Sequence, residues 1–365
     1  GGSRRPVQWF FDNLLPEEEA RRLLAQDADL PVADAFGLLA WYGAESAGAL
    51  TLLPTGESPA PGGLKPLPDT ELSMRIRRLP QVALSHDAPK RMSLPGAQHK
   101  LAVALQDGAL WEPVGHTPST HILKPDHADT ERYPHSAVNE WFVMRLARAV
   151  KLPVPDVVLR YVPEPVYLVE RFDRVGTRPE LRRRHVLDGC QLLSLDRHFK
   201  YQQATVENLQ RLISLCRAKA ATRQALFRWV LFNVLVGNGD SHLKNLSFFV
   251  GPQGVELTPH YDLLSTTVYA TPGAWGEAEL SWPMGAARRF GDLCRDDVAA
   301  FGQTLGLPTK LGLRLLDELC LAIENAADAL LAEYETDTAR RAGELRLLRQ
   351  LRFGVLRDGL GWVRR

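Results

Sequence analysis

Apolar positions along the chain follow two different periods, and the change between them falls near residue 203. Before that point, short apolar runs bounded by glycine and proline predict β-strands at 100–105, 121–124, 157–161 and 166–169, the last two forming a hairpin. Among them, residues 138–150 have the spacing of an amphipathic helix. After residue 203 helical spacing dominates, with one predicted strand pair at 246–250 and 255–257 and long helices at 313–334 and 339–352.

A strand-rich half followed by a helical half predicts an α+β fold with two lobes. The N-lobe is expected to be strand-rich, and the C-lobe all-helical apart from the strand pair. A small unit precedes both, with a helix expected after Pro16 and a second apolar stretch at 36–42. Proline and glycine then crowd residues 54–63, which predicts a linker. The expected parts are an N-terminal subdomain, a linker and connector, an N-lobe and a C-lobe, at 1–53, 54–85, 86–175 and 176–365.

The composition excludes several classes of protein. The 365 residues carry 44 Lys and Arg against 43 Asp and Glu, so a disordered chain and a free-standing nucleic-acid binder are both disfavoured. There is no apolar run long enough to span a membrane and no signal peptide, which predicts a cytoplasmic protein with no membrane partner. Four scattered cysteines are expected to be reduced. The chain opens on Gly1-Gly2-Ser3 without methionine, so we expect the native N-terminus to be missing or encoded separately.

The stretch most informative about chemistry lies between a strongly apolar helix and the predicted strand pair. Asp240 and Asn245 stand five residues apart in a polar loop, the spacing of the catalytic aspartate and metal-binding asparagine of protein kinases. Lys244 is placed to offset phosphate charge. Asp262 follows the strand pair, 17 residues after Asn245, where a kinase carries a second Mg²⁺ ligand. The order of these residues predicts phosphoryl transfer.

Lys124 is a second candidate, because it ends a predicted strand where a kinase places a lysine on the ATP phosphates. Only nine of the 44 basic residues are lysines. A lysine buried at this point needs an acidic partner, which Glu140 or Glu170 could supply. We favour Glu140, because its helix follows the strand. By contrast, the segment 92–100 has one glycine and is a weak phosphate loop by its chemistry alone, in which Ser93 is predicted to be a surface turn residue.

Taken together, these motifs resemble the HipA-type toxin kinases. The resemblance rests on Ser93-x-x-Gly96-Ala97-Gln98-x-Lys100, Asn139-Glu140-Trp141, Glu170-Arg171-Phe172-Asp173-Arg174, the block 237–245 and Tyr261-Asp262-Leu263-Leu264-Ser265. It runs in order from about residue 10 to the helical C-terminus, and residues 10–50 look like the second part of the family's N-terminal domain. The resemblance implies a two-lobed protein-kinase-like fold.

The resemblance also implies roles for single residues. It implies ATP and Mg²⁺ as cofactors, Asp240 as catalytic base assisted by Lys244, and Asn245 and Asp262 as metal ligands. The expected nucleotide-binding residues are Lys124 on the phosphates, Gly96 and Gln98 in the phosphate loop, Glu170 and Phe172 at the adenine, and Asp173 and His242 near the ribose and phosphates. Ser93 would be an autophosphorylation site whose phosphate expels the loop and stops ATP binding.

The implied biology is that of a toxin–antitoxin pair. A member of this family would phosphorylate a serine or threonine of a translation-related protein, typically an aminoacyl-tRNA synthetase, and so arrest growth. Its expected partners are a helix-turn-helix antitoxin, HipB-like, through which alone it would meet DNA, and a separate small HipS-like protein in some systems. Two alternatives stay open: a small-molecule kinase of related fold, and a non-catalytic ATP-binding co-repressor of an antitoxin–DNA complex.

Overall fold

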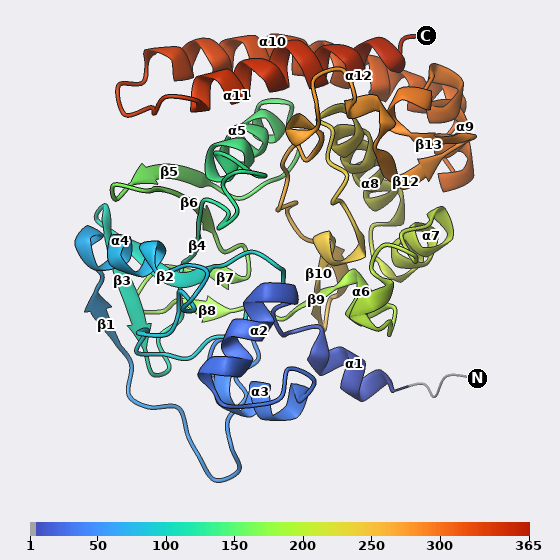
Figure 1. Ribbon diagram of the computed structural model, residues 1–365. Coiled ribbons are helices and arrows are strands. Elements are labelled where there is room, and N and C mark those ends of the chain that lie inside the picture. The colour runs from blue at the N-terminus through green and yellow to red at the C-terminus, as the bar shows by residue number, and fades with distance from the viewer. Residues whose placement is uncertain (1–4) are drawn as a thin grey trace. The chain divides into compact units, whose positions relative to one another are not determined.

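The computed structural model describes residues 5–365, which form two compact units (Figure 1). The first unit runs to Ala137 and takes in Pro155–Arg197, and the second consists of Val138–Val154 and His198–Arg365. Within residues 5–365, no helix combines the length and the apolar character needed to cross a lipid bilayer.

The first unit is built on a six-stranded antiparallel sheet in the order β1-β3-β2-β4-β6-β5. Its strands are β1 (Gly63–Pro66), β2 (Leu101–Gln106), β3 (Ala109–Val114), β4 (His121–Pro125), β5 (Val157–Tyr161) and β6 (Pro165–Glu170). The predicted hairpin is confirmed, with Val157 opposite Val169 and Tyr161 opposite Pro165. Residues 101–104 of β2 are all fully buried, which explains why this strand appears in the sequence as a continuous apolar run.

Three short helices form the N-terminal subdomain: α1 (Pro6–Asp12), α2 (Glu18–Asp27) and α3 (Ala35–Tyr42). They share a small core of their own that includes Leu15, Leu23, Leu38 and Tyr42. Asp34 caps α3, since its Oδ1 accepts a hydrogen bond from the Gly37 amide at 2.9 Å. The helix expected after Pro16 is confirmed as α2, and the apolar stretch at 36–42 lies within α3.

The structure differs from the prediction that 54–85 is linker and connector, because it places β1 and α4 (Asp69–Arg77) there. β1 pairs only with β3, and an edge strand tolerates the proline that argued against a strand. α4 carries acids in its first turn and arginines in its last, as the helix dipole favours. Its Leu72 joins the core of the sheet, and its buried Arg75 is 2.6 Å from Glu112 of β3.

The division between the units also differs from the predicted lobe boundary at 175, because the first unit continues to Arg197. The added residues form β8 (Arg182–Arg183), which pairs with β7 (Arg174–Val175), then β9 (Val186–Asp188) and α6 (Gly189–Leu192). The chain leaves the first unit through η1 (Arg197–Phe199). Conversely, most of α5 (Ser136–Ala149), the helix predicted at 138–150, belongs to the second unit.

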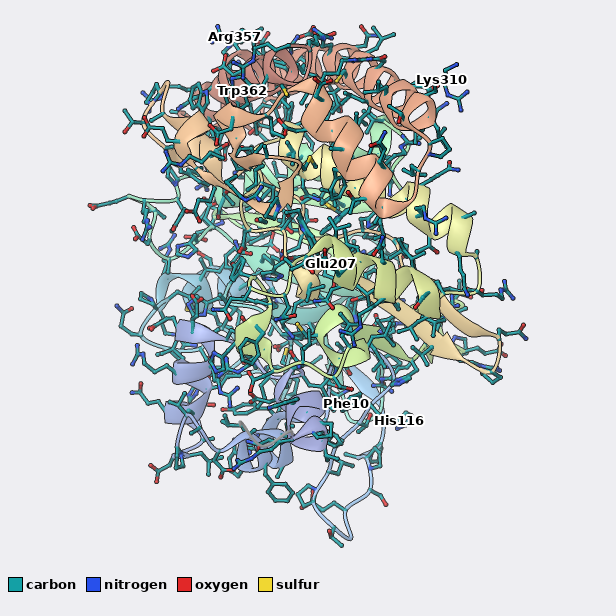
Figure 2. The ribbon with its side chains drawn as sticks, turned by 90° about the vertical axis from the view of Figure 1, so that its right-hand side faces the viewer. Phe10, His116, Glu207, Lys310, Arg357 and Trp362 are labelled. Atoms are coloured by element: carbon teal, nitrogen blue, oxygen red, sulfur yellow. The ribbon has the colours of Figure 1, made fainter. Side chains whose placement is uncertain are left out.

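The second unit is mainly helical, as expected. Its longer helices are α7 (Val206–Leu215), α8 (Lys219–Leu235), α9 (Arg295–Leu305), α10 (Thr309–Thr336), α11 (Glu344–Gln350) and α12 (Arg357–Trp362), with a π-helical stretch at Leu351–Leu356. Short 3₁₀ turns lie at Leu243–Asn245, Thr267–Tyr269, Trp275–Glu277 and Phe290–Asp292. Figure 2 shows Trp362 at the end of α12, and its ring packs closely on Gly276, where a Cβ would lie 3.0 Å from it.

Two hairpins interrupt these helices. The strands β10 (Ser247–Gly251) and β11 (Gly254–Leu257) pair as the sequence predicts. A second hairpin, β12 (Glu279–Met284) with β13 (Ala287–Arg289), was not expected and corrects the description of this lobe as otherwise all-helical. Its pairing is irregular between Glu279 and Met284, although Leu280, Trp282 and Met284 alternate as buried positions along β12.

Candidate active site

The polar loop that carries Asp240 leaves the buried helix α8 through a glycine that no other residue could replace without strain. Gly237 has φ +68°, and a Cβ at this position would lie 2.0 Å from the side-chain oxygen of Thr267. Its carbonyl oxygen accepts hydrogen bonds from the amides of Thr266 and Thr267, at 2.9 and 3.0 Å. The loop is thereby fixed to the segment that follows Asp262.

Asparagine side chains hold the backbone around Asp240. The Asn238 Nδ2 donates to Asn233 Oδ1 in α8 at 2.7 Å, and the Asn238 Oδ1 accepts from the Asp240 amide at 3.0 Å. The carboxylate of Asp240 accepts a hydrogen bond from the hydroxyl of Tyr201. Neither Asn233 nor Tyr201 was a candidate from the sequence, because both lie outside the motif.

Asn245 and Asp262, which are 17 residues apart in the chain, are in direct contact. The Asn245 Nδ2 donates to Asp262 Oδ2 at 2.8 Å, and its Oδ1 accepts from the His242 amide at 2.9 Å. Asp262 has φ +60°, a left-handed conformation that is uncommon for a residue other than glycine. The Tyr261 hydroxyl donates to the Lys244 carbonyl at 2.8 Å, so that the two segments are joined twice.

The pair fits a magnesium ion that is bound together with a nucleotide. Within residues 5–365, no three or more His, Cys, Asp or Glu side chains gather as a cluster that could hold a metal. Mg²⁺ does not require such a cage, because it usually binds through one or two protein oxygens, substrate phosphates and water. The carboxylate of Asp262 and the amide oxygen of Asn245 are hard oxygen donors of the kind it prefers, and the two side chains are in contact through the Asn245 Nδ2 while its Oδ1 faces the His242 amide.

Two buried residues support this segment from either side. Asn139 of α5 exchanges two hydrogen bonds with the backbone of Ser265, at 2.7 and 3.0 Å, which gives a structural reason for the Asn139-Glu140-Trp141 motif. Two positions before Asp262, burial lowers the pKa of His260 to about 3, so this histidine is neutral. Its ring stacks on Trp229 of α8, 6.0 Å between centroids.

In the first unit, Lys124 lies at the end of β4 and is only 6% exposed. Its ammonium group is 5.8 Å from the centre of the Tyr167 ring, directly across the sheet on β6. Glu170 is exposed and lies opposite His121, three residues before Lys124 in β4, so it is not the cross-strand neighbour of Lys124. Glu140 is buried in α5. The choice of Glu140 as the partner of Lys124 stays a prediction.

Three residues at and after the end of β6 were expected to bind the nucleotide: Glu170, Phe172 and Asp173. Phe172 is half-buried and Glu170 exposed, but the carboxylate of Asp173 is buried and fully used within the first unit. Its oxygens accept hydrogen bonds from Arg171 at 2.7 and 2.9 Å and from the Gly48 amide at 2.7 Å. Asp173 therefore helps to hold the N-terminal subdomain, and its assignment near the ribose and phosphates stays a prediction.

Asp173 belongs to a buried ion cluster that the sequence did not reveal, formed by Glu45, Lys90, Arg171, Asp173, Arg174 and Arg183. Glu45 is its centre: it is fully buried and 2.5 Å from Lys90, 2.8 Å from Arg174, 3.0 Å from Arg183 and 3.3 Å from Arg171. Burial acts to raise the pKa of Glu45, but the four cations hold it well below its usual value. The cluster joins residues from four distant parts of the chain.

The phosphate-loop segment lies against the N-terminal subdomain, and the prediction of a surface serine at 93 is wrong. Ser93 is fully buried, its hydroxyl donates to the Leu14 carbonyl at 2.8 Å, and its amide donates to the Glu45 carbonyl at 2.8 Å. The Glu17 amide donates to the Gly96 carbonyl at 3.1 Å, and Gly96 has φ +110°. Both partners, Leu14 and Glu45, lie in the N-terminal subdomain, which covers Ser93.

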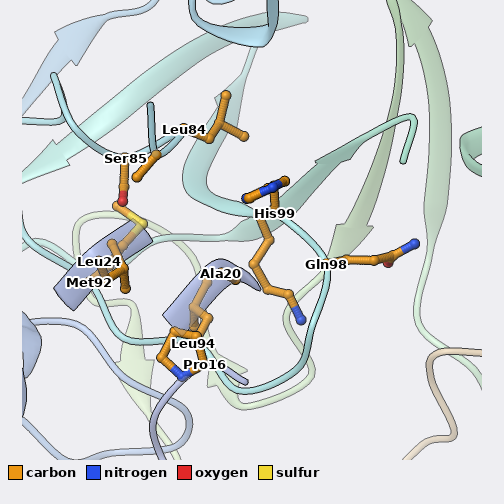
Figure 3. A pocket seen from close by; sticks show the side chains of 11 residues that line it. Pro16, Ala20, Leu24, Leu84, Ser85, Met92, Leu94, Gln98 and His99 are labelled. Carbon is orange, nitrogen blue, oxygen red and sulfur yellow. The ribbon is translucent and has the colours of Figure 1, made fainter. Parts of the chain in front are cut away.

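Figure 3 shows a small cavity beside this loop. Leu24, Met92 and Leu94 line it, with Gln98 and His99 at one side. Its volume is about 30 Å³, enough for a water molecule but not for a nucleotide base or phosphate chain. Gly96 and Gln98 are both partly exposed, so they remain accessible for binding a phosphate.

The chain belongs to the HipA family of serine/threonine kinase toxins. Residues 92–327 match the HipA-like C-terminal domain, and residues 2–53 match the HipA N-terminal domain. The chain is 32% identical over 343 residues to the serine/threonine-protein kinase toxin HipA of Shewanella oneidensis, covering 89% of this chain and 77% of that protein. It is 39% identical over 282 residues to Y4mE of Sinorhizobium fredii, covering 73% of this chain and 66% of that protein.

The fold agrees with this assignment. In a solved structure, that of the Shewanella oneidensis HipA, HipB and operator DNA complex, a chain superposes with a TM-score of 0.84 at 28% identity, over 98% of this chain and 85% of that one. The resemblance seen in the motifs is thus confirmed, as is the two-lobed kinase-like α+β fold.

Proposed function

We propose that this protein is an ATP- and Mg²⁺-dependent serine/threonine protein kinase that acts as the toxin of a toxin–antitoxin pair. The observation that carries the proposal is the contact between Asn245 and Asp262 beside the loop of Asp240. Asn245 and Asp262 carry oxygen donors suited to a metal, and Asp240 carries a carboxylate suited to act as a base. The three residues follow one another in the chain order that kinases use.

Asp240 is assigned as the base. As the acceptor hydroxyl oxygen forms its bond to the γ-phosphorus of ATP, the hydroxyl proton passes to the carboxylate of Asp240. The bond between the γ-phosphorus and the bridging oxygen breaks, and its electron pair leaves with ADP. Asn245 and Asp262 would hold Mg²⁺, which supplies neutralisation of the phosphate charge. Lys244 and His242, both buried in the same loop, are assigned to the phosphates.

The first unit would supply the nucleotide-binding residues. Lys124 is a buried cation at a strand end, suited to the α- and β-phosphates. Glu170 and Phe172 lie where the chain leaves β6, and their backbone groups are assigned to adenine. Gly96 and Gln98 are assigned to the phosphate loop, where the positive φ of Gly96 lets the backbone approach an anion closely.

Ser93 is assigned as an inhibitory autophosphorylation site. Its hydroxyl is fully buried against Leu14, so a dianionic phosphate could not remain there. The loop would have to leave its position, taking Gly96 and Gln98 with it and preventing ATP binding.

The biological role follows from the family. The related HipA was solved with HipB and operator DNA, and we propose a corresponding helix-turn-helix antitoxin as the partner of this chain, with a HipS-like protein where the system has three components. A net charge of +1 agrees with a kinase that meets DNA only through that antitoxin. The proposed substrate is a translation-related protein of the cytoplasm, such as an aminoacyl-tRNA synthetase, whose phosphorylation would arrest growth.

The proposal is tested by incubating a desalted bacterial lysate with ATP, Mg²⁺ and either wild type or Asp240→Asn, followed by phosphopeptide mass spectrometry. We expect one or a few serine or threonine sites that gain phosphate with wild type alone. In a parallel reaction with [γ-³²P]ATP and lysate that has not been desalted, label in small molecules only would identify a small-molecule kinase instead. ATP binding without any transfer would identify a co-repressor.

A further inference from the structure

The short segment that follows η1 lies against the catalytic loop within the second unit, although no motif marks it. The Leu243 amide donates to the Lys200 carbonyl at 3.3 Å, which fixes the backbone of the segment to the loop. The ring of Tyr201 meets that of His242 edge-on, 4.9 Å between centroids. The Tyr201 hydroxyl donates to Asp240 Oδ1. One residue thus reaches the proposed base from a segment 39 residues earlier in the chain.

We propose that Tyr201 is a positioning residue that holds the carboxylate of Asp240 in the orientation needed to accept a proton from the substrate hydroxyl. This inference rests on the proposed function. The backbone of Asp240 is held by Asn238, but the last torsion of an aspartate side chain is soft. A hydrogen bond from the Tyr201 hydroxyl to Oδ1 restricts that torsion.

An opposite role, in which the tyrosine hydroxyl blocks the base until a substrate displaces it, would need a side chain that can leave easily. The Tyr201 side chain is 46% exposed, so it is reachable from solvent. However, its ring packs against His242, and the preceding residue is tied to Leu243. This anchoring favours a fixed support over a removable cap. The two roles also predict opposite changes in rate.

The test compares Tyr201→Phe with wild type in single-turnover transfer of label from [γ-³²P]ATP to the protein, over a range of ATP concentrations. The variant retains the ring and its contact with His242 and loses only the hydroxyl. A general base contributes roughly 10²–10⁴-fold, so disordering its carboxylate should lower the maximum rate by about tenfold or more. We expect the half-saturating ATP concentration and the melting temperature to stay unchanged.

The control is Phe199→Leu. Phe199 is an exposed residue two positions before Tyr201, at the end of η1, and its substitution should leave both kinetic parameters unchanged. An unchanged or faster maximum rate in Tyr201→Phe would overturn the inference, the faster rate in favour of a blocking tyrosine. A fall in ATP affinity together with the rate would also overturn it, because it would show a general disturbance of the loop. If wild type transfers no label, the proposed function itself fails, which is a distinct result.

Discussion

Replacing Glu45 by glutamine would remove one negative charge from the centre of the buried ion cluster while keeping the shape of the side chain. In the native protein four cations surround Glu45 and Asp173, and the Glu45 side chain has no exposed surface. The Lys90, Arg171 and Arg174 side chains are at most 3% exposed, so they would lose the Glu45 charge without gaining water, and Asp173 would remain as the partner of the two arginines. Breaking a buried ion pair in this way typically costs about 3–5 kcal/mol.

Hydrogen exchange at single amides can measure the loss of stability that Glu45→Gln causes around the cluster. Three amides of this region have defined acceptors. The Ser93 amide donates to the Glu45 carbonyl, the Gly48 amide to the Asp173 carboxylate and the Arg171 amide to the Thr120 carbonyl. Since each 1.4 kcal/mol is tenfold in an equilibrium, a loss of 3 kcal/mol should reduce the protection of these amides by about 100-fold. Amides in the middle of α8, in the second unit, should keep their protection.

The matched control is Asp317→Asn, which also removes one carboxylate charge from an arginine. Asp317 pairs with Arg295 at 2.7 Å, but the two side chains are 58% and 33% exposed. Such surface pairs contribute about 0–1 kcal/mol. If Glu45→Gln and Asp317→Asn had equally small effects, the argument that the cluster holds the N-terminal subdomain in place would be refuted.

The remaining predictions concern pH and the phosphate loop. Burial lowers the pKa of His260 to about 3, so below pH 6.5 only the unfolded chain takes up its proton, and stability should fall as pH falls. Between pH 7 and pH 5 the wild type should lose about 2 kcal/mol of unfolding free energy through this histidine. The stability difference between wild type and His260→Gln should therefore shrink by that amount over the same range. A stability difference that does not change with pH would contradict this prediction. Ser93→Asp should bind ATP at least about tenfold more weakly than Ser93→Ala by calorimetry, because a buried unpaired carboxylate displaces the loop whereas alanine fits. Equal affinities would show that the loop tolerates the charge.

Much of this architecture could be predicted because it depends on local sequence patterns, namely apolar runs and the spacing of polar residues. The apolar runs at 121–124, 157–161 and 166–169 predicted β4 and the β5–β6 hairpin. The spacing from Asp240 to Asp262 predicted Asn245 and Asp262 as ligands of one metal, and the structure places the two side chains in contact. The edge strand β1 was missed because its proline is unfavourable everywhere except at an edge, which only the assembled sheet reveals.

Contacts between distant segments could not be predicted from the same patterns. Glu45, Lys90 and Arg171 are ordinary charged residues in the sequence, and only the fold shows that they share one buried site. Ser93 was expected on the surface because proline and glycine follow it, but the N-terminal subdomain covers it. Tyr201 reaches Asp240 across 39 residues that contain two whole helices. In each case the information lies in packing and not in periodicity.

The central claim is that the carboxylate of Asp240 drives transfer of the γ-phosphate, and it is tested most directly with the purified protein. Wild type and Asp240→Asn would be mixed with [γ-³²P]ATP and Mg²⁺, label on serine or threonine would be counted, and ATP affinity would be measured by calorimetry. We predict ATP binding in both proteins, and a loss of labelling in Asp240→Asn of at least about 100-fold. Labelling of Asp240→Asn at the wild-type rate would contradict the assignment of the base, and with it the proposed site.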